Sequence, residues 1–302
     1  MIAVFAILMT HHLGETSMYY GLILISVMIF GGCFALDDLY RRHRGSSIRI
    51  SLEYALMSAL AGSVVLTVIN GFRLECTSFT LLMALLNVLV NFGYTFCTFR
   101  ALGTINLSLY SVFSMLGGMA LPFLQGILIY GESLTLGKSI CVLLIGIALG
   151  LTIQRGKPGK HAIYYAGVFL LNGASGILSK VYTASLLPKA SAAGYSILIC
   201  LCTACASTLL LSLFYKQNAP RLTLKSTAIG ALSGAGNKVA NYFLVIALSH
   251  VDASVQYPMV TGGVMIVSTL LCFFGPKKPS RRELLSVLFG FAGMLALFLI
   301  PV

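Results

Sequence analysis

The chain has 302 residues, of which 58% are hydrophobic and only 9% are charged. Soluble domains carry about 25% charged residues, so this composition excludes an ordinary soluble domain and indicates a helical membrane protein. The net charge of +12 does not indicate binding to nucleic acid, because the basic residues lie in short breaks between long apolar runs.

The first 17 residues form a short apolar stretch that ends in His11, His12 and Glu15. This stretch holds roughly ten apolar residues, too few to span a bilayer, and it lacks the basic start of a signal peptide. A second methionine, Met18, begins a more ordinary start. We therefore predict that residues 1–17 are a dispensable N-terminal extension.

Ten apolar spans follow, and short polar breaks with glycine and proline separate them. The first five spans lie at about residues 19–37, 50–70, 79–99, 107–130 and 137–153. The second five lie at about residues 163–186, 192–215, 227–248, 253–274 and 284–300. No connection is long enough to hold a separate soluble domain. The sequence predicts an all-α polytopic protein with ten transmembrane helices.

The two halves carry a weak internal repeat. At an offset of 146 residues Asn91 matches Asn237 and Ser108 matches Ser254. Five helices per repeat is an odd number, so the two halves must be inverted in the membrane, with a substrate site between them near the midplane. We predict a first repeat at residues 18–155 and a second repeat at residues 156–302.

This arrangement resembles the drug/metabolite transporter superfamily in its ten-helix, EamA-type form. The resemblance is most specific from Ala101 to Leu134, where a short junction leads into a helix with Gly117, Gly118 and Pro122, followed by a Gly131-Glu132 step. The second repeat departs from this pattern at Gly275-Pro276. The resemblance implies a central cavity lined by the first, third and fourth helices of each repeat. It also implies a homodimer formed through the fifth helices.

The most polar stretch inside an apolar span runs from Gly234 to Tyr242, and Lys238 lies near its centre. An intramembrane charge is costly, so Lys238 is a functional-site hypothesis, against the alternative that its side chain reaches the membrane surface. The helix period places Asn237 and Asn241 on one face, and likewise Lys238 and Tyr242.

Further polar residues are expected to line the same cavity, against the alternative that they pack helices together. They are Asn87, Asn91 and Tyr94 in the third span, Tyr110 and Ser114 in the fourth, Asn172 in the sixth, and Gln256, Tyr257 and Thr261 in the ninth.

The acidic residues are expected to lie at helix ends. Asp37 and Asp38 end the first span beside Arg41 and Arg42, which predicts an interfacial, ion-paired cap. With no acid expected at the midplane, Lys238 has no internal partner, and a substrate carboxylate or phosphate would supply the countercharge. The same absence argues against a carboxylate proton switch like that of the small multidrug pumps.

Charge also predicts the orientation. Fifteen of the 20 Lys and Arg residues lie in loops that follow odd-numbered spans. The positive-inside rule places these loops in the cytoplasm of a multi-pass protein of the cell membrane, here a bacterial plasma membrane, with both termini outside.

The leading functional hypothesis is a secondary transporter that moves a small polar metabolite, anionic or zwitterionic, by alternating access. The alternatives are an exporter of multiple drugs or cationic compounds and, below it, an intramembrane lipid-modifying enzyme. The enzyme hypothesis has only His250 and Asp252 as acid–base candidates. Cys200, Cys202 and Cys205 share one span with no nearby His or acid, which favours packing over metal binding. We expect no catalysis, cofactor or metal, and as partners only a small-molecule substrate, the lipid bilayer and a second copy of the chain.

Overall fold

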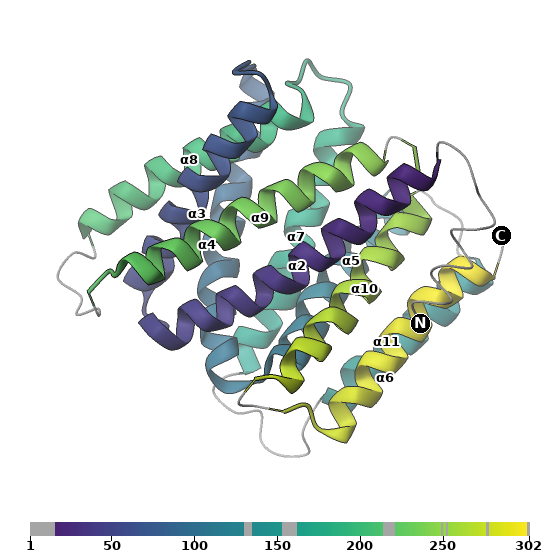
Figure 1. Cartoon of the computed structure of the whole chain (residues 1–302). Helices are drawn as coiled ribbons and strands as arrows, with labels where there is room; N and C mark the ends of the chain where they lie inside the picture. The colour runs from purple at the N-terminus through teal and green to yellow at the C-terminus, as the bar shows by residue number, and fades with distance from the viewer. Residues whose placement is uncertain are drawn as a thin grey trace.

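The computed structural model describes residues 16–129, 135–152, 162–213, 221–248, 250–251, 253–275 and 278–300, and all of its regular structure is helical. The helices are α2 (Thr16–Arg44), α3 (Ile48–Ile69), α4 (Ser78–Thr104), α5 (Leu107–Leu128), α6 (Leu136–Thr152), α7 (Ala162–Ala184), α8 (Ala192–Leu213), α9 (Leu224–Leu248), α10 (Ala253–Phe273) and α11 (Arg281–Leu299) (Figure 1). One helix coincides with each predicted span, so the all-α class is confirmed. The proposed extension, residues 1–17, lies outside the described residues except for the last two, which begin α2.

Six of the described helices are long and apolar enough to cross a membrane, namely α2, α3, α4, α5, α7 and α8. In α6 and α10 the apolar stretch is shorter. Large apolar side chains stand exposed along the helices, among them Val64 at 64%, Leu89 at 69%, Leu209 at 70% and Leu232 at 63%. Exposed apolar side chains on this scale are those of a surface that meets lipid or a partner, so the fold is compatible with a multi-pass membrane protein.

The helices pair in a pattern that repeats between the two halves of the chain. Helix α2 packs against α9 and α10, and α7 packs in the same way against α4 and α5. Three further pairs join equivalent helices of the two halves: α3 with α8, α5 with α10, and α6 with α11. Exchanging the first five helices for the second five therefore reproduces these pairings. In Figure 1, α6 and α11 lie together at one side of the bundle.

Glycines allow several of these helices to approach closely. A Cβ at Gly117 of α5 would lie 2.2 Å from the carbonyl oxygen of Phe169 in α7, and one at Gly31 of α2 would lie 2.3 Å from Cγ1 of Val267 in α10. Such a contact leaves no room for any side chain, as in other membrane helix pairs with small residues at the crossing. At these two positions glycine serves packing.

The connections that the structure describes lie at two ends of the bundle. At one end, the α3–α4 and α7–α8 loops meet, where Thr77 Oγ1 donates to the carbonyl of Pro188 at 3.0 Å and the Ser191 amide donates to Glu75 at 2.7 Å. The opposite end holds the C-terminus of α2, the α4–α5 junction and the end of α10, which enclose one cavity. In the described part of the chain, the loops after the second and sixth predicted spans therefore lie apart from those after the first and third.

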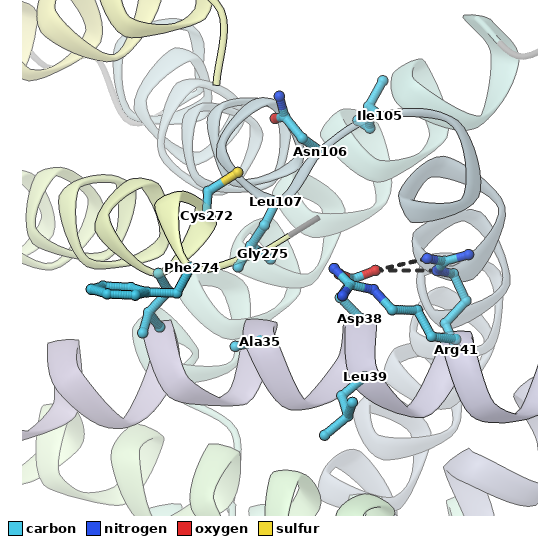
Figure 2. A pocket seen from close by; sticks show the side chains of 12 residues that line it. Ala35, Asp38, Leu39, Arg41, Ile105, Asn106, Leu107, Cys272, Phe274 and Gly275 are labelled. Atoms are coloured by element: carbon cyan, nitrogen blue, oxygen red, sulfur yellow. Dashed lines mark hydrogen bonds and ion pairs between the residues drawn. The ribbon is translucent and has the colours of Figure 1, made fainter. Parts of the chain in front are cut away.

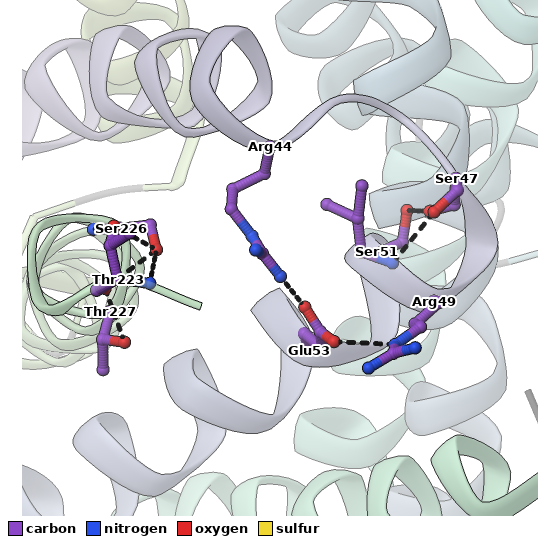
Figure 3. A network of polar contacts seen from close by, with 9 residues as sticks. Arg44, Ser47, Arg49, Ser51, Glu53, Thr223, Ser226 and Thr227 are labelled. Carbon is purple, nitrogen blue, oxygen red and sulfur yellow. Dashed lines mark hydrogen bonds and ion pairs between the residues drawn. The ribbon is translucent and has the colours of Figure 1, made fainter. Parts of the chain in front are cut away.

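The turn between α2 and α3 is held by charged side chains (Figure 3). Arg44 and Arg49 both pair with Glu53, and Gly45 adopts a φ of +97°, which strongly favours glycine. Ser47 caps α3 by accepting a hydrogen bond from the Ile50 amide at 3.3 Å. This turn is one of the polar, glycine-containing breaks that the sequence predicts between spans.

Candidate functional site

A cavity of about 120 Å³ lies among α2, α3, α4, α8 and α9. Its polar lining consists of Asp37 and Tyr54, Ser58, Asn91, Tyr94, Thr95, Thr98, Thr203, Asn237 and Lys238, and the remaining lining residues are Ala55, Ala59, Phe92, Phe99 and Cys200. The volume accommodates several water molecules. The lining contains one acid, one base, two amides and several hydroxyl groups, so it can bind both charges of a small polar molecule.

Lys238 enters this cavity from the middle of α9. It lies about 21 Å from the start of the helix and about 15 Å from its end, at 1.5 Å per residue. Its side chain passes Gly62 of α3, where a Cβ would come within 2.7 Å of Lys238 Cγ. Gly62 therefore provides the space that the lysine side chain occupies. Among the described residues Lys238 makes no ion pair.

Asp37 is the acidic member of the cavity. Its carboxylate accepts hydrogen bonds from the Tyr54 hydroxyl and, at 2.7 Å, from Ser233 Oγ. The Tyr54 hydroxyl also lies 3.1 Å from Ser233 Oγ. These contacts tie α2, α3 and α9 together beside the cavity. Ser233 lies one turn before Asn237 on α9, so Asp37 approaches the polar part of that helix.

The ion pairing predicted for Asp37 and Asp38 is confirmed for Asp38 and wrong for Asp37, and neither residue ends the helix. Asp38 pairs with Arg41 at 3.0 Å and also with Arg42. Successive residues on a helix point about 100° apart, so the two neighbours face different surroundings. Helix α2 also continues to Arg44, which places Asp37 about 10 Å inside the helix end. The expectation that no acid lies at the midplane stays a prediction. Asp37 nevertheless lines the same cavity as Lys238, so a carboxylate is available beside that lysine, and the argument against a proton switch is weakened.

Three of the predicted site residues line the cavity beside Lys238, namely Asn91, Asn237 and Tyr94. The Asn91 amide donates to Asn87 Oδ1 at 2.8 Å, and Asn87 in turn donates to the Tyr195 hydroxyl at 3.3 Å. Asn87 is buried and does not line the cavity, so it orients Asn91.

Tyr110, Ser114 and Asn172 form a buried network behind Tyr94. The Tyr94 hydroxyl lies 2.7 Å from the Tyr110 hydroxyl and 2.8 Å from Ser114 Oγ. Asn172 donates to the Ser114 carbonyl at 2.6 Å. These three predicted residues do not line the cavity but fix the position of a side chain that does.

The remaining predicted residues lie elsewhere. Asn241 is exposed and donates to the Asn237 carbonyl at 2.8 Å, and Tyr242 packs against Leu66, Ile197 and Cys200. Gln256 is buried and donates to the Leu244 carbonyl at 2.9 Å, and Thr261 is buried. None of these four lines the cavity. The Tyr257 side chain, the Gly131-Glu132 step and Asp252 lie outside the described residues.

Sequence reasoning missed the contribution of the second helix of each half. Tyr54 and Ser58 come from α3 and Thr203 comes from α8, whereas α5 and α10 contribute no lining residue. The spacing of Tyr54 and Ser58, four residues apart, indicates one helix face. That signal was present in the sequence. In the described part of the chain, no group of three or more His, Cys, Asp or Glu residues is placed to hold a metal ion.

Fold and cavity together define an all-helical protein whose six long apolar helices fit several crossings of a membrane. No protein-family model matches the sequence, and no curated protein matches it. Among solved structures 20 chains match. One of these, a crystal structure described only as that of a protein, aligns with a TM-score of 0.62 at 20% identity, over 92% of this chain and 96% of that chain. At this identity the likeness shows a shared fold alone.

Proposed function

We propose that the protein is a secondary transporter that moves a small polar metabolite, anionic or zwitterionic, by alternating access. The observation that carries this proposal is the central cavity, where Lys238, Asp37, Asn91 and Asn237 come together from both halves of the chain. Polar and ionisable groups inside a membrane bundle are costly, and they commonly mark a substrate or ion pathway.

The architecture proposed for this transport is two inverted five-helix repeats in the cell membrane. The loops that follow odd-numbered spans would lie in the cytoplasm. The exchange of helix pairings between α2–α6 and α7–α11 supports it, because a two-fold relation produces such an exchange. An odd number of crossings per half then inverts one half relative to the other. Rocking of the halves about the shared cavity would expose it to each side in turn.

Within the cavity, Lys238 would bind the carboxylate or phosphate of the substrate. Lysine suits this role as a point charge on a flexible stem. Asn91, Asn237 and Tyr94 would add neutral hydrogen bonds. For a zwitterion, Asp37 would receive the ammonium group, while Tyr54 and Ser233 hold the carboxylate in place.

A second candidate is the export of cationic compounds, and the position of Asp37 favours it. A carboxylate in the cavity is the group that a cation would bind, and it could exchange the cation for a proton. Lys238 lines the same cavity and repels a simple cation, so this candidate ranks second.

The proposed homodimer would form through the fifth helix of each half, α6 and α11. These two helices pack against each other within one chain, and their exposed leucines, Leu143 and Leu288, would contact the second copy.

The test is a thermal-shift screen of the purified full chain against anionic, zwitterionic and cationic metabolites, because a ligand that binds the folded state raises the apparent melting temperature. Lys238→Met keeps much of the side-chain volume and removes the charge. Loss of a charge-assisted contact costs about 1.5–3 kcal/mol, so affinity for an anionic or zwitterionic hit should fall about 10- to 150-fold. Hits confined to cations, with unchanged affinity in Lys238→Met, would favour the second candidate and exclude the first.

A further inference from the structure

A second cavity, of about 430 Å³, lies at the end of the bundle where Arg41, Arg42, Arg44 and Arg49 surround the turn between α2 and α3. The C-terminal part of α2, the junction between α4 and α5, and the end of α10 enclose it (Figure 2). It shares no lining residue with the central cavity. The transport role proposed for Lys238 and Asp37 therefore does not account for this second cavity.

The charged part of this cavity is a group of three side chains. Arg41 donates to Asp38 Oδ1 from Nε at 3.2 Å and from Nη2 at 3.0 Å (Figure 2). Arg42 pairs with the other carboxylate oxygen. Two guanidinium groups on one carboxylate leave a net charge of +1. Each guanidinium carries five N–H donors in a planar fork, so both have donors beyond those that Asp38 uses. The side chains are 18% and 38% exposed, which leaves them accessible to a ligand.

A further acid, Glu283, contacts one residue of the lining. Glu283 accepts a hydrogen bond from the Asn106 side-chain amide at 2.7 Å and another from the Ser280 backbone amide at 2.6 Å. Asn106 lines the cavity, whereas Glu283 does not. The lining charge is thus set by Asp38, Arg41 and Arg42, and it favours an anion.

Apart from Asn106, the rest of the lining is largely apolar, and part of it faces outward. Leu39 is 37% exposed and Phe274 is 90% exposed, and both line the cavity. A free anion in water gains nothing from such walls. A molecule with an anionic head and a hydrocarbon tail satisfies both the arginines and the apolar side chains.

The depth of the cavity matches the lipid headgroups. Helix α2 has 29 residues and is about 43 Å long, whereas the hydrocarbon core of a bilayer is about 30 Å thick. Arg41 and Arg42 lie within one turn of the end of this helix, so they reach the level of the phosphates. Basic pockets between membrane helices on the positive side commonly take anionic headgroups.

We propose that this cavity binds an anionic phospholipid, with its phosphate on Arg41 and Arg42 and an acyl chain along Leu39 and Phe274. The proposal depends on the helices lying in a bilayer and is independent of what the central cavity transports. The bound lipid would hold the end of α2 against α10 and the α4–α5 junction.

The test counts bound lipids on the purified full chain in detergent by native mass spectrometry. Dioleoyl-phosphatidylglycerol is titrated in one arm, dioleoyl-phosphatidylcholine in a second, and glycerol 3-phosphate in a third. We expect phosphatidylglycerol to bind at least tenfold more tightly than either of the others. Equal binding of the two lipids would overturn the proposal, and so would saturation by glycerol 3-phosphate at the same concentration, since that result would indicate a site for a free phosphate.

Two variants and a control locate the site. Arg42→Gln should weaken phosphatidylglycerol binding about 10-fold. This is the lower end of the loss in affinity expected when one charge-assisted contact is removed. Ala35→Leu keeps both arginines and places a larger side chain in the cavity, so it should also reduce phosphatidylglycerol binding. This variant tests the site even where Arg42→Gln fails to fold. Arg221→Gln removes an exposed positive charge from the loop between α8 and α9, outside the cavity, and should bind like the wild type. If Ala35→Leu bound phosphatidylglycerol as tightly as Arg221→Gln, the lipid would not occupy this cavity.

Discussion

The side chain of Lys238 lies against Gly62 so closely that a Cβ at position 62 would come within 2.7 Å of Lys238 Cγ. The two residues belong to α9 and α3, which come from different halves of the chain. Because a larger residue at position 62 would overlap the lysine side chain, the glycine sets the path of that side chain into the cavity. The position of the cavity's only lysine thus depends on a residue that carries no polar side chain.

The first prediction concerns this contact. Gly62→Ala should leave the protein folded, because a lysine side chain can change rotamer, but it should displace the ammonium group from its present place. We expect affinity for the ligand found by thermal shift to fall several-fold. Gly32→Ala is the matched control, since a Cβ there meets nothing within 4 Å. Equal affinities in the two variants would show that Gly62 does not position Lys238.

The second prediction separates the two neighbouring acids. Asp37→Asn keeps an oxygen that Tyr54 and Ser233 can donate to but removes the charge, so folding should persist while binding of a zwitterion or cation falls roughly tenfold or more. Asp38→Asn removes the partner of Arg41 and Arg42 and should lower the melting temperature while leaving that affinity unchanged. Ligand titration and thermal unfolding of both variants check this. A purely anionic substrate would leave Asp37→Asn at wild-type affinity.

The third prediction tests the crossing of α5 and α7. A methyl group at position 117 would lie 2.2 Å from the Phe169 carbonyl oxygen, so Gly117→Ala forces the helices apart and should destabilise the fold by about 1–3 kcal/mol. Gly146→Ala is the control, because its Cβ would meet nothing within 4 Å. Thermal unfolding in one detergent compares them. An unchanged melting temperature in Gly117→Ala would contradict the close crossing.

The fourth prediction concerns orientation. Among the described residues, Arg41, Arg42, Arg44 and Arg49 cluster at the turn between α2 and α3, and the positive-inside rule places that end of the bundle in the cytoplasm. A reporter enzyme that is active only outside the cytoplasm, fused after Val302, should therefore be active. The same reporter inserted in the loop between α8 and α9, within residues 214–220, should be inactive. The reverse pattern would show that the protein is inserted the other way up.

The fifth prediction concerns the start of the chain. A protein that begins at Met18 should insert, purify and bind ligand like the full chain, because the polar contacts that hold α2 begin at Ser26, which donates to the Ala240 carbonyl at 3.1 Å. Membrane yield and ligand affinity of the two forms are the measurements. A loss of insertion in the shorter form would show that residues 1–17 are needed.

The ten helices could be predicted from the sequence because of one physical constraint. Backbone groups in a bilayer must be paired within the chain, so an apolar run of about 20 residues between polar breaks forms a helix. The predicted ends were least accurate for α2 and α4, which continue to Arg44 and Thr104. There the predicted span ended at charged residues, Asp37 and Asp38 in α2 and Arg100 in α4. The helix nevertheless continues through Arg41, Arg42 and Arg100, because arginine is a good helix former.

The candidate site could be predicted only in part. The sequence was enough to single out Lys238, Asn237, Asn91 and Tyr94, because a polar group inside an apolar span is costly and commonly marks a functional site. The roles of Asn87, Tyr110 and Asn172 could not be predicted, since a buried polar side chain that orients another looks the same in sequence as one that meets a ligand.

By itself, the sequence determined that this chain is a helical protein with a lysine in the middle of its eighth apolar span. Only the tertiary structure decided which polar residues share a cavity with that lysine. Asp37 and Asp38 are adjacent in sequence, yet one faces α9 and the other faces Arg41 and Arg42. Which way a side chain points depends on how α2 is rotated about its axis. That rotation is set by contacts with α9 and α10, which belong to the other half of the chain.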